Sequence, residues 1–311
     1  MFCNANIFGG ATLTLYFANI AVLSVSSACY KKERKFMQKL TCDYLGVARI
    51  SGPLLFIENT QKISYGEVVK ILGKDKVERK GRVIDVGENI AIVQVFEGTR
   101  DLAAIDTKVC FCGTPLQFKV SKDLLGRVLN GMGEPIDDAP FPFAGEFRDI
   151  NGYSINPVCR LYPSDFIQTG ISSIDGLNTL IRGQKIPIFS GNGLPHDFLA
   201  TQIARQSKLL NSNEEFVVIF VAMGVKYDVA DFFIKSFEES GALKNVTMFL
   251  NLANDPPEER IATPRVALTL AEHLAFDEGM HVLVIMTDMT NYCESLIEIG
   301  SAKGEVPSRK G

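Results

Sequence analysis

A glycine-rich turn between an apolar strand and a helix is the segment of this sequence best suited to hold a phosphate group. It lies in the stretch KIPIFSGNGLPHDFLATQIARQ, residues 185–206. The order of strand, turn and helix is that of the phosphate-binding loop GxxxxGK[ST], whose backbone N–H groups point into one concavity at a helix N-terminus. In such loops a lysine reaches the outer phosphates, and a Ser or Thr hydroxyl holds magnesium.

The residues in this turn depart from the pattern where the chemistry is done. Ser190 takes the place of the first glycine and Pro195 that of the second. His196 stands where the lysine belongs, and Asp197 stands where the hydroxyl residue belongs. The candidate binding residues thus form a degenerate phosphate loop: Ser190, Gly191, Asn192, Gly193, Leu194, Pro195, His196 and Asp197.

Three of these departures weaken nucleotide binding. Pro195 has no backbone N–H to donate, and His196 is shorter than lysine and mostly neutral at pH 7. Asp197 puts a negative charge where a phosphate would lie, and two unit charges ~4 Å apart repel by ~4 kcal/mol at an effective dielectric of ~20. The structural alternative makes Asp197 the N-cap of the helix, with Gly191 and Gly193 serving the tight turn. We therefore expect no tight ATP binding by this chain itself.

Two further positions complete the search for catalytic groups. Asp288 follows the apolar run HVLVIMT and is a candidate for the strand-end acid near magnesium, although acids are common at strand ends. A general base is harder to place, because the preceding apolar strand ends in Met223, Gly224 and Val225, with no carboxylate to orient an attacking water. We therefore assign no catalytic residue and no metal ligand, and whether the chain is an enzyme stays open.

Alternating strands and helices must position this turn. The apolar runs predict, in order, a buried strand 184–190, a helix 197–210, a strand 215–223, a helix 228–240, a strand 246–252, a helix 264–277 and a strand 281–287. Strands of this kind form a parallel sheet covered on both faces, whose ligands lie beyond the carboxyl ends of the strands. The sequence therefore predicts an α/β domain over residues 113–311.

Short apolar runs split by Gly, Asn and Asp turns precede that domain between residues 46 and 112. Their spacing predicts a small antiparallel barrel or sandwich over residues 37–112. The low basic and aromatic content argues against an RNA-binding barrel. The formal net charge of −4, from 32 basic and 36 acidic side chains, also argues against nucleic acid as a partner.

Residues 1–36 form an N-terminal extension whose first 30 residues carry no charged side chain. We interpret it as the product of a start codon chosen too early, with translation beginning at Met37; a membrane anchor is the alternative. The seven cysteines are irregularly spaced and contain no CxxC pair, which argues against a zinc site or a disulfide framework.

Several long stretches, taken in order, resemble the non-catalytic B subunit (beta chain) of V-type rotary ATPases and ATP synthases of the archaeal and bacterial sort. The resemblance covers residues 44–311. Its most specific stretches are QVFEGT (94–99), IQTGISSID (167–175), GLPH (193–196), FLNLANDP (249–256), ERIATPR (259–265) and VLVIMTDMTNY (282–292). It implies a small N-terminal antiparallel β-barrel followed by a RecA-like α/β domain of the phosphate-loop type.

The resemblance also implies partners and a role. In the family, ATP or ADP with magnesium binds at the interface with the catalytic A subunit, and alternating A and B subunits form a hexameric head. Central and peripheral stalk subunits couple that head to a membrane sector that moves protons or sodium ions. The complex is peripheral on the cytoplasmic face of the membrane. Catalytic relatives carry a glutamate where this chain has Val225.

Two departures from the family matter. Members begin near Met37, and they continue beyond Gly311 through the rest of the sheet and a helical C-terminal domain, which implies an incomplete nucleotide-binding-type domain here. Three hypotheses follow: a structural and regulatory subunit of a rotary ATPase, a RecA-like ATPase that hydrolyses ATP by itself, and a non-functional truncated remnant. The missing lysine and base favour the first.

Overall fold

The computed structural model describes residues 16–22, 42–58, 63–152, 165–191, 193–209 and 215–303 of the chain. They form two compact units. One is built on Phe118–Asp255 and Ala262–Glu294 and includes the strand β1, and the other is built on residues 42–117, Pro256–Ile261 and 295–303. Within the described residues, no helix is long and apolar enough to cross a membrane.

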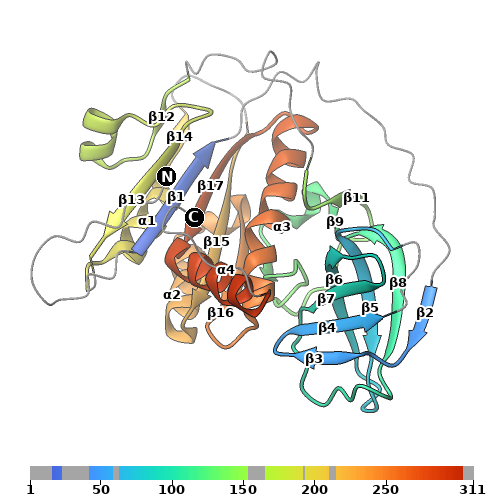
Figure 1. The fold of residues 1–311 in the computed structure, drawn as a ribbon. Coiled ribbons are helices and arrows are strands. Elements are labelled where there is room, and N and C mark those ends of the chain that lie inside the picture. Colours follow the sequence, from blue (N-terminus) through green and yellow to red (C-terminus); the bar gives the residue numbers. More distant parts are fainter. Residues whose placement is uncertain are drawn as a thin grey trace, which may run out of the picture. The chain divides into compact units, whose positions relative to one another are not determined.

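A seven-stranded antiparallel sheet makes up most of the second unit, in the order β2-β8-β5-β6-β7-β4-β3 (Figure 1). Its strands are β2 (Cys42–Leu45), β3 (Arg49–Ser51), β4 (Leu54–Glu58), β5 (Glu67–Leu72), β6 (Glu78–Val86), β7 (Ile90–Val95) and β8 (Lys108–Pro115). Burial alternates along β5, where Val69 and Ile71 are fully buried. Strands with one apolar face close over a core when the sheet curves, so the predicted antiparallel barrel is confirmed.

A six-stranded sheet is the centre of the first unit, in the order β10-β16-β15-β17-β1-β13. Its strands are β1 (Tyr16–Val22), β10 (Val128–Asn130), β13 (Lys185–Ser190), β15 (Phe216–Val225), β16 (Val246–Leu252) and β17 (His281–Thr287). The first four strands in that order run parallel to one another, and β1 runs antiparallel to both of its neighbours. The predicted α/β domain is confirmed.

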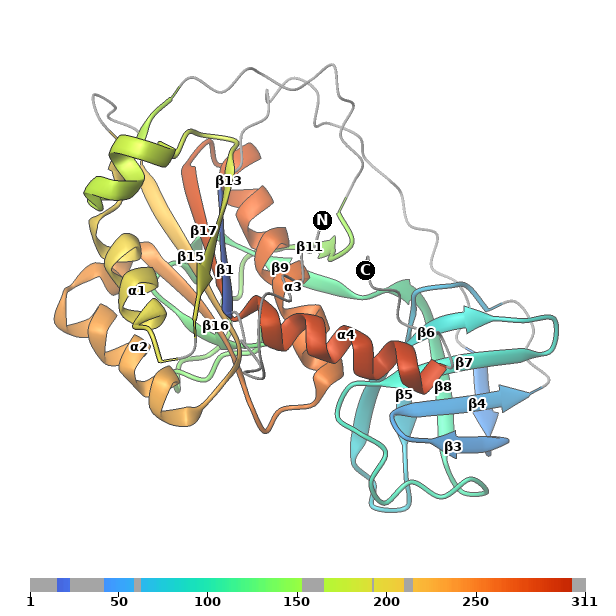
Figure 2. The same ribbon diagram turned by 60° about the vertical axis from the view of Figure 1, so that its left-hand side comes forward.

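Helices cover this sheet on both faces. They are α1 (His196–Gln206), α2 (Tyr227–Glu239), α3 (Pro257–Phe276) and α4 (Met289–Lys303). Figure 2 shows α1 and α2 on one face and α3 on the other. The remaining elements are β9 (Gln117–Val120), β11 (Glu146–Asp149), β12 (Ile167–Gln168), β14 (Lys208–Leu209) and the short helical turns Lys122–Leu124, Ile174–Asn178 and Ala242–Asn245.

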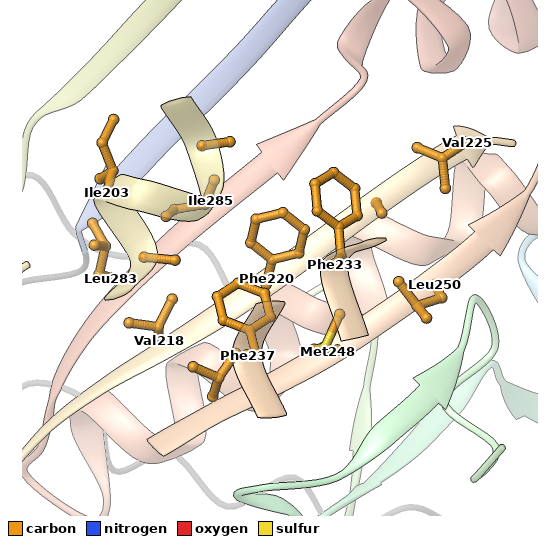
Figure 3. Packing of buried hydrophobic residues seen from close by; sticks show 14 of the residues in the cluster. Ile203, Val218, Phe220, Val225, Phe233, Phe237, Met248, Leu250, Leu283 and Ile285 are labelled. Atoms are coloured by element: carbon orange, nitrogen blue, oxygen red, sulfur yellow. The ribbon is translucent and has the colours of Figure 1, made fainter. Parts of the chain in front are cut away.

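The core under α1 and α2 fixes the sheet against these helices. Phe220 of β15 is fully buried, and its ring centroid lies 4.7 Å from that of Phe233 and 5.2 Å from that of Phe237, both on α2 (Figure 3). Ile203 of α1 and Leu283 of β17 belong to the same cluster. Aromatic side chains of this size dominate core energetics, so this cluster anchors the sheet to α1 and α2.

Three predicted elements differ from the structure. The strand predicted as buried over 184–190 is β13, which ends the sheet order; its residues alternate, with Ser190 buried and Phe189 exposed. The helix predicted over 197–210 ends at Gln206, because the backbone becomes extended at Ser207 and β14 pairs with β12. The helix predicted from 264 starts at Pro257, a position that tolerates proline, and Pro264 lies inside it.

Glu258, in the first turn of α3, is a buried carboxylic acid. It is 3 % exposed, and its Oε1 has no hydrogen-bond partner among the described residues. Burial raises the pKa of Glu258 to about 7, and Glu298 of α4 adds to the rise. In the unfolded chain Glu258 has the ordinary glutamate pKa of 4.5, so folding becomes less favourable as the pH rises from there to about 7.

Glu258→Gln is therefore expected to stabilise the protein at alkaline pH. The free energy of unfolding should rise by about 1–2 kcal/mol at pH 8, and the difference from the unchanged protein should vanish near pH 4.5. Urea denaturation at both pH values measures it. Glu239→Gln, at an exposed position of α2, is the matched control and should show no such pH-dependent gain. An equal gain at both pH values would contradict the account.

Candidate functional site

The degenerate loop lies at the carboxyl edge of the sheet, between β13 and α1. Seven of its eight predicted residues are described, and Asn192 lies outside the described residues. Ser190 is buried, and its Oγ donates to the backbone O of Gly191 at 3.2 Å. Gly193 has φ +82°, a left-handed conformation that a residue with a Cβ adopts only under strain. The predicted strand–turn–helix frame is thus present.

Backbone donors in the second half of the loop are used within the loop. The N–H of Leu194 donates to the carbonyl of Gly191 at 3.2 Å, and the N–H of His196 donates to the carbonyl of Leu194 at 2.9 Å. Pro195 between them has no N–H. Three consecutive residues therefore offer no backbone donor to a phosphate, whereas a phosphate loop depends on a row of such donors.

Asp197 lies in the first turn of α1 and does not cap it, so the predicted N-cap role is wrong. The helix begins one residue earlier, at His196, and Pro195 is the N-cap residue without a side-chain hydrogen bond. A negative charge in the first turn interacts favourably with the helix dipole by about 0.3–1 kcal/mol. The carboxylate that would repel a phosphate therefore stabilises the helix.

The Asp197 side chain lies beside His196, with 3.5 Å between Oδ1 of the acid and Nε2 of the histidine. Burial raises the pKa of Asp197, and His196 acts in the opposite direction. The Nδ1 atom of His196 is 3.0 Å from the carbonyl oxygen of Leu194, so the imidazole contacts the loop itself. An imidazole and a carboxylate thus stand where a phosphate loop carries its lysine and its hydroxyl residue.

Asp288 follows β17, at the same edge of the sheet as the loop. It is 5 % exposed, and its Oδ1 accepts a hydrogen bond of 3.0 Å from the N–H of Thr290 in the first turn of α4. Because β1 lies between β13 and β17, the two strand ends are about 10 Å apart, two strand spacings. Asp288 therefore lies at the edge of the sheet where the strand-end acid was predicted. Its hydrogen bond to the N–H of Thr290 is that of a helix N-cap.

Two asparagines, which were not predicted from the sequence, form hydrogen bonds with the backbone at the end of β15. Oδ1 of Asn251 accepts from the N–H of Gly224 at 3.1 Å. Nδ2 of Asn291 donates to the carbonyls of Met223 and Gly224, each at 3.0 Å. Val225 is 7 % exposed and belongs to the apolar cluster (Figure 3). The position that carries a glutamate in catalytic relatives is therefore part of the core here.

Large apolar side chains are exposed in the loop and on elements next to it in the chain or in the fold, a second feature that was not predicted from the sequence. Leu194 is 59 % exposed and Phe198 61 % exposed. The Phe198 ring lies 4.6 Å from that of Phe232 on α2, which fixes it at the surface. Phe189 and Tyr227 are also exposed. We call Phe189, Leu194, Phe198 and Tyr227 the loop patch. The described residues contain no group of three His, Cys, Asp or Glu that could hold a metal ion.

Two models of a single protein family match the sequence. The nucleotide-binding domain of the ATP synthase alpha/beta family matches residues 170–311, and the beta-barrel domain of the same family matches residues 47–113. The fold and the loop define a protein with a β-barrel and a nucleotide-binding-type α/β domain. The chain belongs to the ATP synthase alpha/beta family.

Within that family the chain is similar to the V-type ATP synthase beta chain of Halothermothrix orenii. The two are 58% identical over 272 residues, which are 88% of this chain and 59% of that protein. The chain thus spans about three fifths of the length of this curated relative. The predicted resemblance to the B subunit, or beta chain, of V-type ATPases is confirmed.

Proposed function

We propose that this chain is a non-catalytic, regulatory and structural B subunit in the head of a V-type rotary ATPase or ATP synthase. Its partner is the catalytic A subunit, with which it alternates in a hexamer on the cytoplasmic face of the membrane. ATP or ADP with magnesium binds at the interface, mainly on the A partner. Through stalk subunits, the head couples hydrolysis or synthesis of ATP to the transport of protons or sodium ions.

The geometry of the loop is the observation that carries this proposal. The segment 194–196 offers no free backbone donor, and Asp197 adds a negative charge at the helix start. Catalysis of phosphoryl transfer depends on positioning and charge stabilisation, which need those donors and a cation. A nucleotide-binding-type domain that lacks both suits a subunit that supports a catalytic neighbour.

The loop patch supports a protein partner at this edge of the sheet. Leu194 is 59 % exposed and Phe198 61 % exposed, so apolar surface adjoins the loop. Aromatic residues fixed at a surface are typical anchors of protein interfaces. The self-sufficient ATPase, by contrast, would need a base at the end of β15, where Val225 is buried.

The proposal predicts a complex with a catalytic A subunit that depends on the loop patch. Phe198→Asp should weaken association at least tenfold, because it places a charge in an apolar contact. Phe143→Asp, at a fully exposed position away from the loop, is the matched control and should leave association unchanged. Analytical ultracentrifugation of mixtures of the two subunits measures the change.

Two outcomes would contradict different parts of the proposal. Absence of any complex between the unchanged chain and the A subunit would defeat the proposed function. Equal weakening by Phe198→Asp and Phe143→Asp would remove the loop patch from the interface and leave the complex itself in place.

A further inference from the structure

Two cysteines lie two residues apart on strand β8 of the barrel, on the face that points away from the core. Phe111 between them is 1 % exposed, and its ring packs edge-on against that of Tyr44, with 5.5 Å between the centroids. Because successive side chains of a strand point to opposite faces, Cys110 and Cys112 share the outer face. Both are half-buried, and neither is in a disulfide. Figure 1 shows β8 between its partner strands β2 and β5.

The thiol of Cys112 leans back along the strand toward Cys110. Its Sγ donates to the backbone carbonyl of Cys110 at 3.9 Å. The thiol of Cys110 forms a hydrogen bond with the carboxylate of Asp43, the residue directly opposite on β2. Rotation of the Cys110 side chain away from Asp43 turns both sulfur atoms toward the space between them.

The spacing of the two cysteines suits a bridging cation better than a disulfide. Alternate residues of a strand lie ~6.7 Å apart, whereas a disulfide needs Cβ atoms about 3.5–4.5 Å apart. A cation between the sulfur atoms puts two metal–sulfur bonds in place of one S–S bond, so it spans a longer gap. Zn(II) takes four ligands, and the described part of the chain holds no group of three His, Cys, Asp or Glu that could bind a metal. Two thiolates alone suit Cu(I), a soft cation that is stable with two sulfur ligands.

Two ion pairs flank the thiols on the same face. Lys70, directly opposite Cys110 on β5, pairs with Glu78 at 2.8 Å. Lys108, two residues before Cys110, pairs with Asp43 at 2.9 Å. Two thiolates and one Cu(I) ion together carry a single negative charge, which the two ammonium groups favour and the two carboxylates oppose. The surroundings are therefore close to neutral and tolerate a complex with one charge.

We propose that Cys110 and Cys112 form a binding site for Cu(I) on the outer face of the barrel. The two thiols lose their protons to water, and each sulfur atom donates an electron pair to one Cu(I) ion bound between them. No electron is transferred in this step, so the metal arrives as Cu(I). The inference concerns the barrel alone and is independent of the proposed function.

Anaerobic titration of the full chain with Cu(I), held by a chromophoric chelator of known affinity, tests the proposal. Cys110→Ser and Cys112→Ser should each lower the affinity of the tightest site at least hundredfold. Even a residue that only contacts a metal ligand typically changes metal affinity by ~10–100-fold, and here a ligand itself is lost. Cys293→Ser, at a half-buried cysteine of α4, is the matched control and should leave the titration unchanged. Zn(II) should bind at least hundredfold more weakly than Cu(I).

Three results would overturn the proposal. Equal Cu(I) affinity in the unchanged chain and in a variant with both Cys110→Ser and Cys112→Ser would place the metal elsewhere. A loss of affinity in only one of the two single variants would show that the thiols do not act as a pair. Zn(II) bound as tightly as Cu(I) would indicate a site with more ligands than these two.

X-ray absorption of the unchanged chain, loaded with half an equivalent of Cu(I), gives a second measurement that needs no variant. The copper spectrum should show two sulfur neighbours. Nitrogen or oxygen neighbours, or three or more sulfur neighbours, would contradict the proposed site.

Discussion

Restoring the phosphate-loop residues is expected to raise the affinity of this chain for Mg·ATP by about tenfold to hundredfold, or about 1.4–2.8 kcal/mol. The variant combines Pro195→Gly, His196→Lys and Asp197→Thr. It returns one backbone N–H, adds a cation that can reach the phosphates, and removes a carboxylate that repels them by several kcal/mol at short range. The strand–turn–helix frame that it needs is already present between β13 and α1.

Isothermal titration calorimetry with Mg·ATP measures this gain. Asp197→Asn alone should give a smaller gain, because it removes the charge without supplying the lysine. Asp228→Asn, which removes the acid in the first turn of α2, is the matched control and should leave the affinity for Mg·ATP unchanged. Nucleotide affinity that is the same in the triple variant and in the unchanged chain would contradict the assignment of the loop as the defective part.

Val225→Glu is expected to destabilise the protein by about 3–4 kcal/mol without conferring ATP hydrolysis. It supplies the carboxylate that catalytic relatives carry, but Val225 is 7 % exposed and packs in the apolar cluster under α2. Burial would raise the pKa of the new carboxyl group, so the loss of stability should grow as the pH rises above the pKa of an ordinary glutamate.

Chemical denaturation at pH 6 and pH 8 measures this loss. Lys226→Glu is the matched control, since it adds a carboxylate at the next residue, which is exposed, and should cost far less. A Val225→Glu protein that is as stable as the Lys226→Glu protein would show that the end of β15 is not packed as described.

The sequence predicted those parts of the fold that depend on local pattern. The strands over 246–252 and 281–287 have the predicted bounds, because a seven-residue apolar run flanked by turn residues is too short for a typical helix and favours a buried strand. Strand β13 was predicted as buried because its composition is equally apolar. Burial depends on neighbours in the sheet, and β13 lies at the end of the sheet order.

The candidate site, like the fold, could be predicted only in part. The order of strand, loop and helix and the defects at Pro195, His196 and Asp197 could be read from residue types. The use of the Leu194 and His196 N–H groups within the loop could not, because it depends on backbone geometry. The roles of Asn251 and Asn291 could not be predicted for a related reason. Each side-chain amide forms a hydrogen bond with the backbone of a strand that is distant in sequence, and the residue type alone does not indicate which strand that is.

The strand β1 was the least predictable element. Tyr16–Val22 lies in a segment that the composition set apart from the rest of the chain, and its partners are more than 160 residues away. Pairing at that separation in sequence produces no periodic pattern in the residues. Strand propensity indicates only that a segment suits a sheet, and it does not indicate which strand it pairs with. The interpretation of residues 1–36 as a product of an early start stays a prediction.

The rate of phosphate release from Mg·ATP by the purified chain, alone and with a catalytic A subunit, tests the central claim most directly. The account predicts no release above background from the chain alone, and release once the A subunit is present, because the loop 190–197 lacks the donors and the cation that catalysis needs. Steady release by the chain alone that is lost in a His196→Ala variant would contradict it.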